Sequence, residues 1–180
     1  GLHLLAQQDT QIAITGAQLP ITIDGQEKDQ WRVLSLRRGE SLELGFSEVG
    51  CRSYLAVRGG FTVAPIFGST STVVREGIGG LHGGKLEAGD VLPIAALEPI
   101  DPRWIPPRQR PSYHKQAILR VVLGYQVNDF SALDQQRFFS SEYQVSDRCD
   151  RMGYRLDGPA IPCSRPGMLS EGIALGAIPV

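Results

Sequence analysis

The residues best suited to chemistry in this sequence lie in two stretches, of which the first is an arginine turn from Cys149 to Gly158. Within it, Arg151 follows Asp150 directly and precedes Gly153 by two positions. Arginine presents a planar fork of N–H donors that suits a carboxylate or a phosphate. Two interpretations of Arg151 stay open: a guanidinium that binds an anion, or one half of a structural ion pair that fixes the loop.

The second stretch is rich in glycine and in hydroxyl side chains. It holds the pairs Gly59-Gly60 and Gly79-Gly80 and the Ser/Thr cluster of residues 69–72. Glycine lets backbone N–H groups approach a ligand closely, and clustered N–H groups bind anions. We interpret the stretch first as a tight set of barrel turns with a capped short helix, and a loop that contacts an oxyanion or phosphate is the alternative. The candidate substrate- or nucleotide-binding residues of both stretches are Gly59, Gly60, Ser69, Ser71, Thr72, Gly79, Gly80, Asp150 and Gly153.

One part of the glycine-rich stretch imitates a phosphate loop. Residues 79–85 match G-x-x-x-x-G-K, but Leu86 follows where that motif needs Ser or Thr to hold Mg²⁺. A strand-like segment comes next, instead of the helix whose N-terminus would face phosphate. We therefore reject this motif as a nucleotide site. The three histidines and three cysteines are scattered, so no metal site is expected either.

Composition places the chain among ordinary globular proteins. Its 180 residues are 42% hydrophobic and 21% charged, with a formal net charge of −1 and no long basic run, so we expect neither a nucleic-acid nor a membrane partner. Three cysteines without a C-x-x-C spacing favour a reducing, cytoplasmic setting. The missing initiator methionine and the strand-like residues 176–180 lead us to expect truncation at both ends.

The elements that must position these residues are mostly short strands. Alternating or β-branched runs predict strands over 11–15, 20–23, 31–36, 41–46, 54–57, 91–94 and 118–123. Asp24-Gly25 predicts a tight hairpin, because both central positions of a type I′ turn need positive φ. One helix is predicted from a cap at Ser131 to about Ser140, and a shorter one over 71–76. The expected fold class is mostly β, a barrel or sandwich with one or two short helices.

A proline-rich segment, residues 98–117, divides the chain. Proline fixes φ and removes a backbone donor, so this segment is expected to be extended and free of strands. We expect a first β-barrel unit over 1–97, a linker over 98–117, and the start of a second β unit over 118–180. A proline-rich ligand for another domain is the alternative for the linker.

Six short motifs, taken in order, carry a family resemblance. They are residues 52–60 (RSYLAVRGG), 68–72 (GSTST), 77–81 (GIGGL), 88–93 (AGDVLP), 150–156 (DRMGYRL) and 169–172 (LSEG), the last followed by 176–178 (GAI). Over nearly its whole length the chain resembles the family of the 5-oxoprolinase C subunit, also called allophanate hydrolase subunit 2 or the biotin-dependent carboxyltransferase-like family. It departs from the family pattern at Cys149, where serine is more usual, and it lacks the early Thr-Thr-Val-Gln-Asp and late Thr-Gly-Gly-Tyr-Pro segments.

The resemblance implies a cyclophilin-like β-barrel architecture and an enzyme subunit that acts with partner subunits B and A. Such complexes use ATP to hydrolyse 5-oxo-L-proline to L-glutamate, and Arg151 is the candidate catalytic residue for that reaction. We expect the isolated fragment to be inactive. An alternative is biotin-dependent carboxyl transfer in the urea amidolyase or allophanate pathway. A third is a regulatory binding protein that antagonises a kinase inhibitor.

Overall fold

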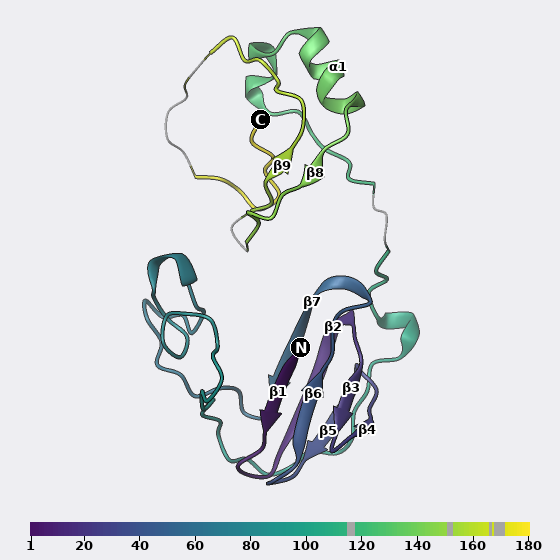
Figure 1. Cartoon of the computed structure of the whole chain (residues 1–180), viewed down its shortest axis with the longest axis vertical. Helices are drawn as coiled ribbons and strands as arrows, with labels where there is room; N and C mark the ends of the chain where they lie inside the picture. Colours follow the sequence, from purple (N-terminus) through teal and green to yellow (C-terminus); the bar gives the residue numbers. More distant parts are fainter. Residues whose placement is uncertain (115–117, 151–152, 166, 168–171) are drawn as a thin grey trace. The chain divides into compact units, whose positions relative to one another are not determined.

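The computed structural model describes residues 1–114, 118–150, 153–165, 167 and 172–180 (Figure 1). The chain forms two units, Gly1–Ala117 and Ile118–Val180. Arg151, the predicted catalytic residue, lies outside the described residues, as does most of the 169–172 motif.

Unit 1 contains two antiparallel sheets. One has the order β1 (Leu2–Leu5), β6 (Ser41–Leu44), β3 (Ile21–Ile23) and β4 (Gln26–Glu27). The other has the order β5 (Val33–Leu36), β2 (Thr10–Gln18) and β7 (Val49–Val57). The predicted mostly β fold class is confirmed, and the described strands form these two open sheets without closing a barrel.

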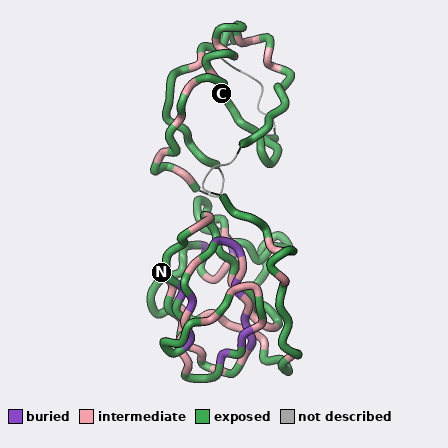
Figure 2. Tube along the Cα trace, turned by 90° about the vertical axis from the view of Figure 1, so that its right-hand side faces the viewer, coloured by how far each residue is buried: buried purple, intermediate pink, exposed green. Residues whose placement is uncertain are grey.

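The two sheets enclose one hydrophobic core, drawn in purple within unit 1 in Figure 2. Successive side chains of a strand point to opposite faces, so residues two apart share the buried face. Each of four strands contributes such a pair: Ile12 and Ile14, Ile21 and Ile23, Leu34 and Leu36, Leu42 and Leu44. Ile14 and Leu42 are completely buried, and burying such a side chain contributes about 1.5–3 kcal/mol.

The hairpin between β3 and β4 forms as predicted. Asp24 and Gly25 both have positive φ, 46° and 74°, and Ile23 pairs with Gln26 across the turn. This is the backbone that a two-residue turn needs to match the twist of its strands.

Two predicted strands are wrong. Over 91–94 only Ile94 makes a bridge, to Phe61, and residues 118–123 form no strand. Ile118 and Val122 are 95% and 96% exposed, and this run is absent from the sheets of the described residues. A β-branched run predicts strand propensity but does not supply a partner. Conversely, β7 begins five residues before the predicted Tyr54.

The proline-rich segment lies against the sheet edge at β5. Val33 N donates to Arg103 O at 2.8 Å, and Ile105 N donates to Trp31 O at 2.8 Å. A short 3₁₀ helix, η2, follows at Pro107–Gln109. Residues 98–114 form no strand beyond a single bridge between Arg32 and Trp104, and they belong to unit 1.

Unit 2 consists of a 3₁₀ helix, η3 (Tyr125–Asp129), the helix α1 (Ala132–Ser140), and the two-stranded ribbon of β8 (Gln144–Val145) and β9 (Leu156–Asp157). The start of α1 is the predicted one, because the Ser131 hydroxyl accepts from Asp134 N at 3.2 Å. The second predicted helix is a single 3₁₀ turn, η1 (Val74–Glu76), in unit 1. No described residue of unit 2 is buried.

No helix in the described parts of the chain is both long and apolar enough to cross a bilayer.

Candidate functional site

The glycine-rich stretch folds into one compact loop in unit 1. Val73 and Ile78 exchange hydrogen bonds across η1, at 2.8 and 3.3 Å. Gly83 N then donates to Gly79 O at 2.8 Å. This winding brings residues 71–72 against residues 79–80, so four of the predicted site residues meet in one place.

Packing explains why this loop needs glycine. Gly79 is buried with φ +75°, and a Cβ there would overlap the carbonyl oxygen of Ser71. A Cβ on Gly80 would overlap the Thr72 side chain in the same way. The two glycines therefore let two backbone segments touch, which is a structural role.

Several polar groups of the loop bond within it. The Ser69 hydroxyl accepts from Ser71 N at 3.1 Å, and Ser69 N donates to Ile66 O at 3.0 Å. A hydroxyl that accepts one bond still has a proton to donate. These bonds support the interpretation as tight turns and leave Ser69 able to offer one donor to a ligand.

Gly59 and Gly60 lie just after the end of β7, where the chain leaves the sheet and enters the glycine-rich loop. Gly60 N donates to Val57 O at 2.9 Å, which closes a turn at the end of β7. The returning chain pairs nearby, because Thr62 N donates to Pro93 O at 2.8 Å. The pair Gly59-Gly60 thus marks the base of the loop that carries the Ser/Thr cluster.

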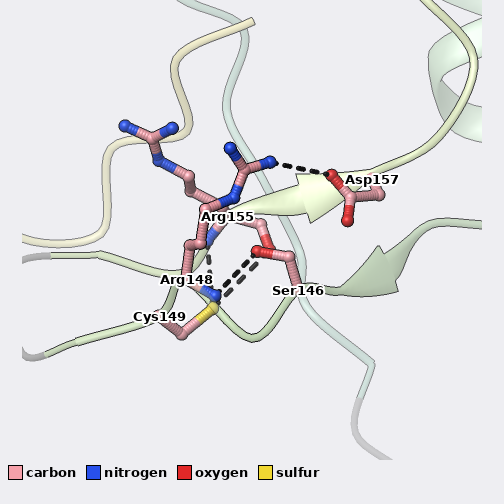
Figure 3. A network of polar contacts seen from close by, with 5 residues as sticks. All are labelled: Ser146, Arg148, Cys149, Arg155 and Asp157. Carbon is pink, nitrogen blue, oxygen red and sulfur yellow. Dashed lines mark hydrogen bonds and ion pairs between the residues drawn. The ribbon is translucent and has the colours of Figure 1, made fainter.

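The Cys149 turn in unit 2 is held by backbone bonds to a sulfur atom (Figure 3). Cys149 Sγ accepts from Arg155 N at 3.2 Å and lies 3.6 Å from Arg155 O, to which the thiol donates. Ser146 N also donates to Arg155 O, at 2.9 Å. These contacts continue the β8–β9 ribbon toward the turn.

Asp150 and Gly153 close the turn itself. Asp150 N donates to Gly153 O, and Gly153 N donates to Asp150 Oδ1, both at 3.2 Å. One observed ion pair of the ribbon is Arg148 with Asp157, 3.9 Å apart and about two-thirds exposed at both side chains. An exposed pair of this length contributes little stability. Asp150 and Gly153 therefore have a structural role here, while the role of Arg151 stays a prediction.

Sequence reasoning missed a groove in unit 1. Its larger cavity, of 530 Å³, is bounded by β2, the start of β7, the 29–31 turn and the end of the proline-rich segment. A second cavity of 320 Å³ shares Asp29, Gln30 and Arg110 with the first. Arg110 and Tyr113 belong to a segment interpreted as a linker, so no sequence signal associated them with a site.

Hydrogen bonds fix the walls of this groove. The Gln30 amide donates to Ala17 O at 2.9 Å, and its oxygen accepts from Leu19 N at 3.3 Å. Trp31 N donates to Ile14 O at 2.9 Å. Arg110 Nε donates to Ile105 O at 2.8 Å, which ties the proline-rich wall together.

The described residues contain no group of His, Cys, Asp and Glu side chains that could hold a metal ion.

Comparison with known proteins defines the family. The model of the carboxyltransferase domain, subdomain A and B, matches residues 1–180. The C subunit of 5-oxoprolinase from Escherichia coli is 34% identical over 97% of this chain and 56% of its own length. The urea amidolyase of Saccharomyces cerevisiae is 36% identical over 88% of this chain and 9% of its own. The chain thus spans little more than half of the former and a small part of the latter.

A solved structure agrees with this result. The crystal structure of the K. lactis urea amidolyase superposes with a TM-score of 0.78 at 28% identity, covering 92% of this chain and 11% of that one. The chain belongs to the carboxyltransferase domain family, subdomain A and B.

Proposed function

We propose that the chain is part of an ATP-dependent 5-oxoprolinase that hydrolyses 5-oxo-L-proline to L-glutamate together with subunits B and A. The observation that carries this proposal is its similarity to relatives named as the C subunit of 5-oxoprolinase. The Haemophilus influenzae protein of that name is 30% identical over the whole of this chain and 57% of its own length. In these relatives the matched region makes up more than half of the protein, whereas in the yeast urea amidolyase it is 9%.

The chemistry explains which groups such a subunit has to supply. A lactam carbonyl is a poor electrophile, and transfer of a phosphoryl group from ATP to its oxygen, with release of ADP, makes the ring carbon a better one. Water then adds at that carbon, the C–N bond breaks to open the ring, and hydrolysis of the resulting acyl phosphate yields L-glutamate and phosphate. Negative charge then develops on oxygen atoms, which N–H, hydroxyl and guanidinium donors stabilise. The Ser69 hydroxyl is one such donor, in the hydrogen-bonded loop of residues 66–83. Arg151 is the cationic candidate of the sequence.

A second candidate function is carboxyl transfer from biotin to urea or a similar amide. The family description and the 36% identity to a urea amidolyase favour it. None of Lys28, Lys85 and Lys115 stands in a Met-Lys-Met context, so a biotin carrier would have to come from another chain or domain.

Reconstitution tests the two candidates. The full-length protein is combined with subunits A and B, and ADP formation is measured with and without 5-oxoproline. ADP formation that rises with 5-oxoproline supports the proposal, and its absence contradicts it. Urea carboxylation that depends on added carboxybiotin would support the second candidate.

A pair of variants tests the arginine. Arg151→Ala is expected to lower turnover by about tenfold or more, because a charge-assisted donor is lost. Arg148→Ala is the matched control, since Arg148 lies three residues away and is two-thirds exposed. Full activity of an assembled Arg151→Ala complex would remove Arg151 from the site.

A further inference from the structure

The missed groove, which is open to solvent on one side, has the volume of a small-molecule site. Its larger cavity, 530 Å³, falls within the roughly 300–1,000 Å³ that such sites occupy. One wall contains an irregularity of β2, where the pairing with β7 shifts between Gly16 and Gln18. Bulges of this kind often lie beside functional sites and redirect the neighbouring side chains.

The backbone of Trp31 is held in a conformation that bulky residues avoid. Its φ is +65°, in the left-handed region. Its N–H donates to Ile14 O in β2 at 2.9 Å, and its carbonyl accepts from Ile105 N in the proline-rich segment at 2.8 Å. These two hydrogen bonds hold the backbone of Trp31 in this conformation. Strain maintained in this way is typical of ligand-contacting positions. Here it places an indole at the groove.

The charges of the groove favour an anion. Arg110 is tied through Nε to Ile105 O, so its two terminal nitrogens remain to form the forked contact that carboxylates accept. Asp29, the acidic side chain among the lining residues, pairs with Arg32 at 3.2 Å. The lining of the two cavities together thus contains two guanidinium groups, of Arg32 and Arg110, and one carboxylate, of Asp29.

The aromatic residues define the other half of the ligand. Trp31 and Tyr113 both line the larger cavity, together with Pro111 and Val49. Aromatic and apolar surfaces of this kind take flat rings, and a Tyr or Trp also has one polar group to offer. We propose that this groove binds a small, flat molecule with a carboxylate group, which pairs with Arg110 while its ring lies against Trp31 and Tyr113. This proposal concerns binding alone and stands apart from the turnover proposed above.

Two probes of equal shape and different charge test the ligand class. Benzoate and benzamide are titrated into the 180-residue chain by calorimetry, with the indole N–H resonances of the two tryptophans followed by NMR. Benzoate is expected to bind saturably and about tenfold or more tightly than benzamide, as a charge-assisted contact requires. Absence of saturable benzoate binding, or equal affinity for both probes, would overturn the proposal.

Matched variants test the residues. Arg110→Gln is expected to weaken benzoate binding about tenfold or more, whereas Arg108→Gln, an exposed arginine that does not line the groove, leaves it unchanged. Trp31→Asn keeps a residue that tolerates positive φ but removes the indole, so the fold persists and benzoate binding falls. Equal affinities of the two arginine variants for benzoate would contradict the assignment of Arg110 as the carboxylate-binding residue. If the reconstituted complex shows no ADP formation that depends on 5-oxoproline while the chain still binds benzoate, the result contradicts the proposed function and leaves this binding proposal standing.

Discussion

Gly79 shows how a residue chosen for a site can be explained by packing. It is buried against the Ser71 carbonyl, with positive φ, in the loop that holds the Ser/Thr cluster. Sequence alone indicated that glycine mattered here, but anion binding and close packing both call for glycine. The contact between residues 71 and 79, which the sequence does not reveal, favours close packing.

Replacing Gly79 by alanine is expected to open this loop. The change adds left-handed strain of about 1–2 kcal/mol and, in addition, the overlap with Ser71 O. Gly68→Ala is the matched control, because Gly68 has φ +76° but nothing within 4 Å of the point that a Cβ would occupy. Amide hydrogen exchange at Val73 and Ile78 measures the effect. Equal exchange rates in the Gly79→Ala and Gly68→Ala variants would contradict this prediction, because the loop would then accommodate the overlap with Ser71 O without opening.

Cys149 allows a second test at the residue scale. Its sulfur both accepts from and donates to the backbone of Arg155. A serine hydroxyl has the same two capacities, so Cys149→Ser should keep the turn, whereas Cys149→Ala should weaken it by about 0.5–1.5 kcal/mol. Hydrogen exchange at the Arg155 amide reports the difference. Faster exchange in the serine variant than in the alanine variant would contradict this account.

Among the elements, those made from local signals could be predicted, and those that need a distant partner could not. The hairpin at Asp24-Gly25 and the cap at Ser131 follow from residues next to them in sequence. The strand expected over 118–123 and the attachment of residues 98–114 depend on segments far away in the chain. The groove depends on the same attachment, which is why Arg110 was not recognised as part of a site.

One buried side chain also holds the start of the proline-rich segment. Gln11 is 9% exposed, and its amide donates to Ile100 O at 2.8 Å and accepts from Ile100 N at 2.7 Å. Gln11→Leu leaves both backbone groups unpaired and should cost about 1–3 kcal/mol. Trypsin cleavage after Arg103 and Arg108 should become faster as the segment detaches. Gln26→Leu, at an exposed position, is the control, and equal cleavage in both variants would contradict the attachment.

At the scale of the whole molecule, the buried apolar residues all belong to unit 1, as far as the described residues extend. Hydrophobic burial is the dominant favourable term in folding. Unit 1 therefore holds most of the stability that the described residues can supply. Both tryptophans, Trp31 and Trp104, also lie in unit 1, so fluorescence reports its unfolding.

This uneven distribution predicts a large contrast between two truncations. Ile14→Ala empties a completely buried site and should lower the free energy of unfolding by about 2–5 kcal/mol. Leu133→Ala, at a side chain 64% exposed in α1, should change it by no more than about 0.5 kcal/mol. Urea denaturation followed by tryptophan fluorescence measures both. A large loss in the Leu133 variant would mean that unit 1 draws stability from unit 2, and the two units would then have to be treated as one folding unit.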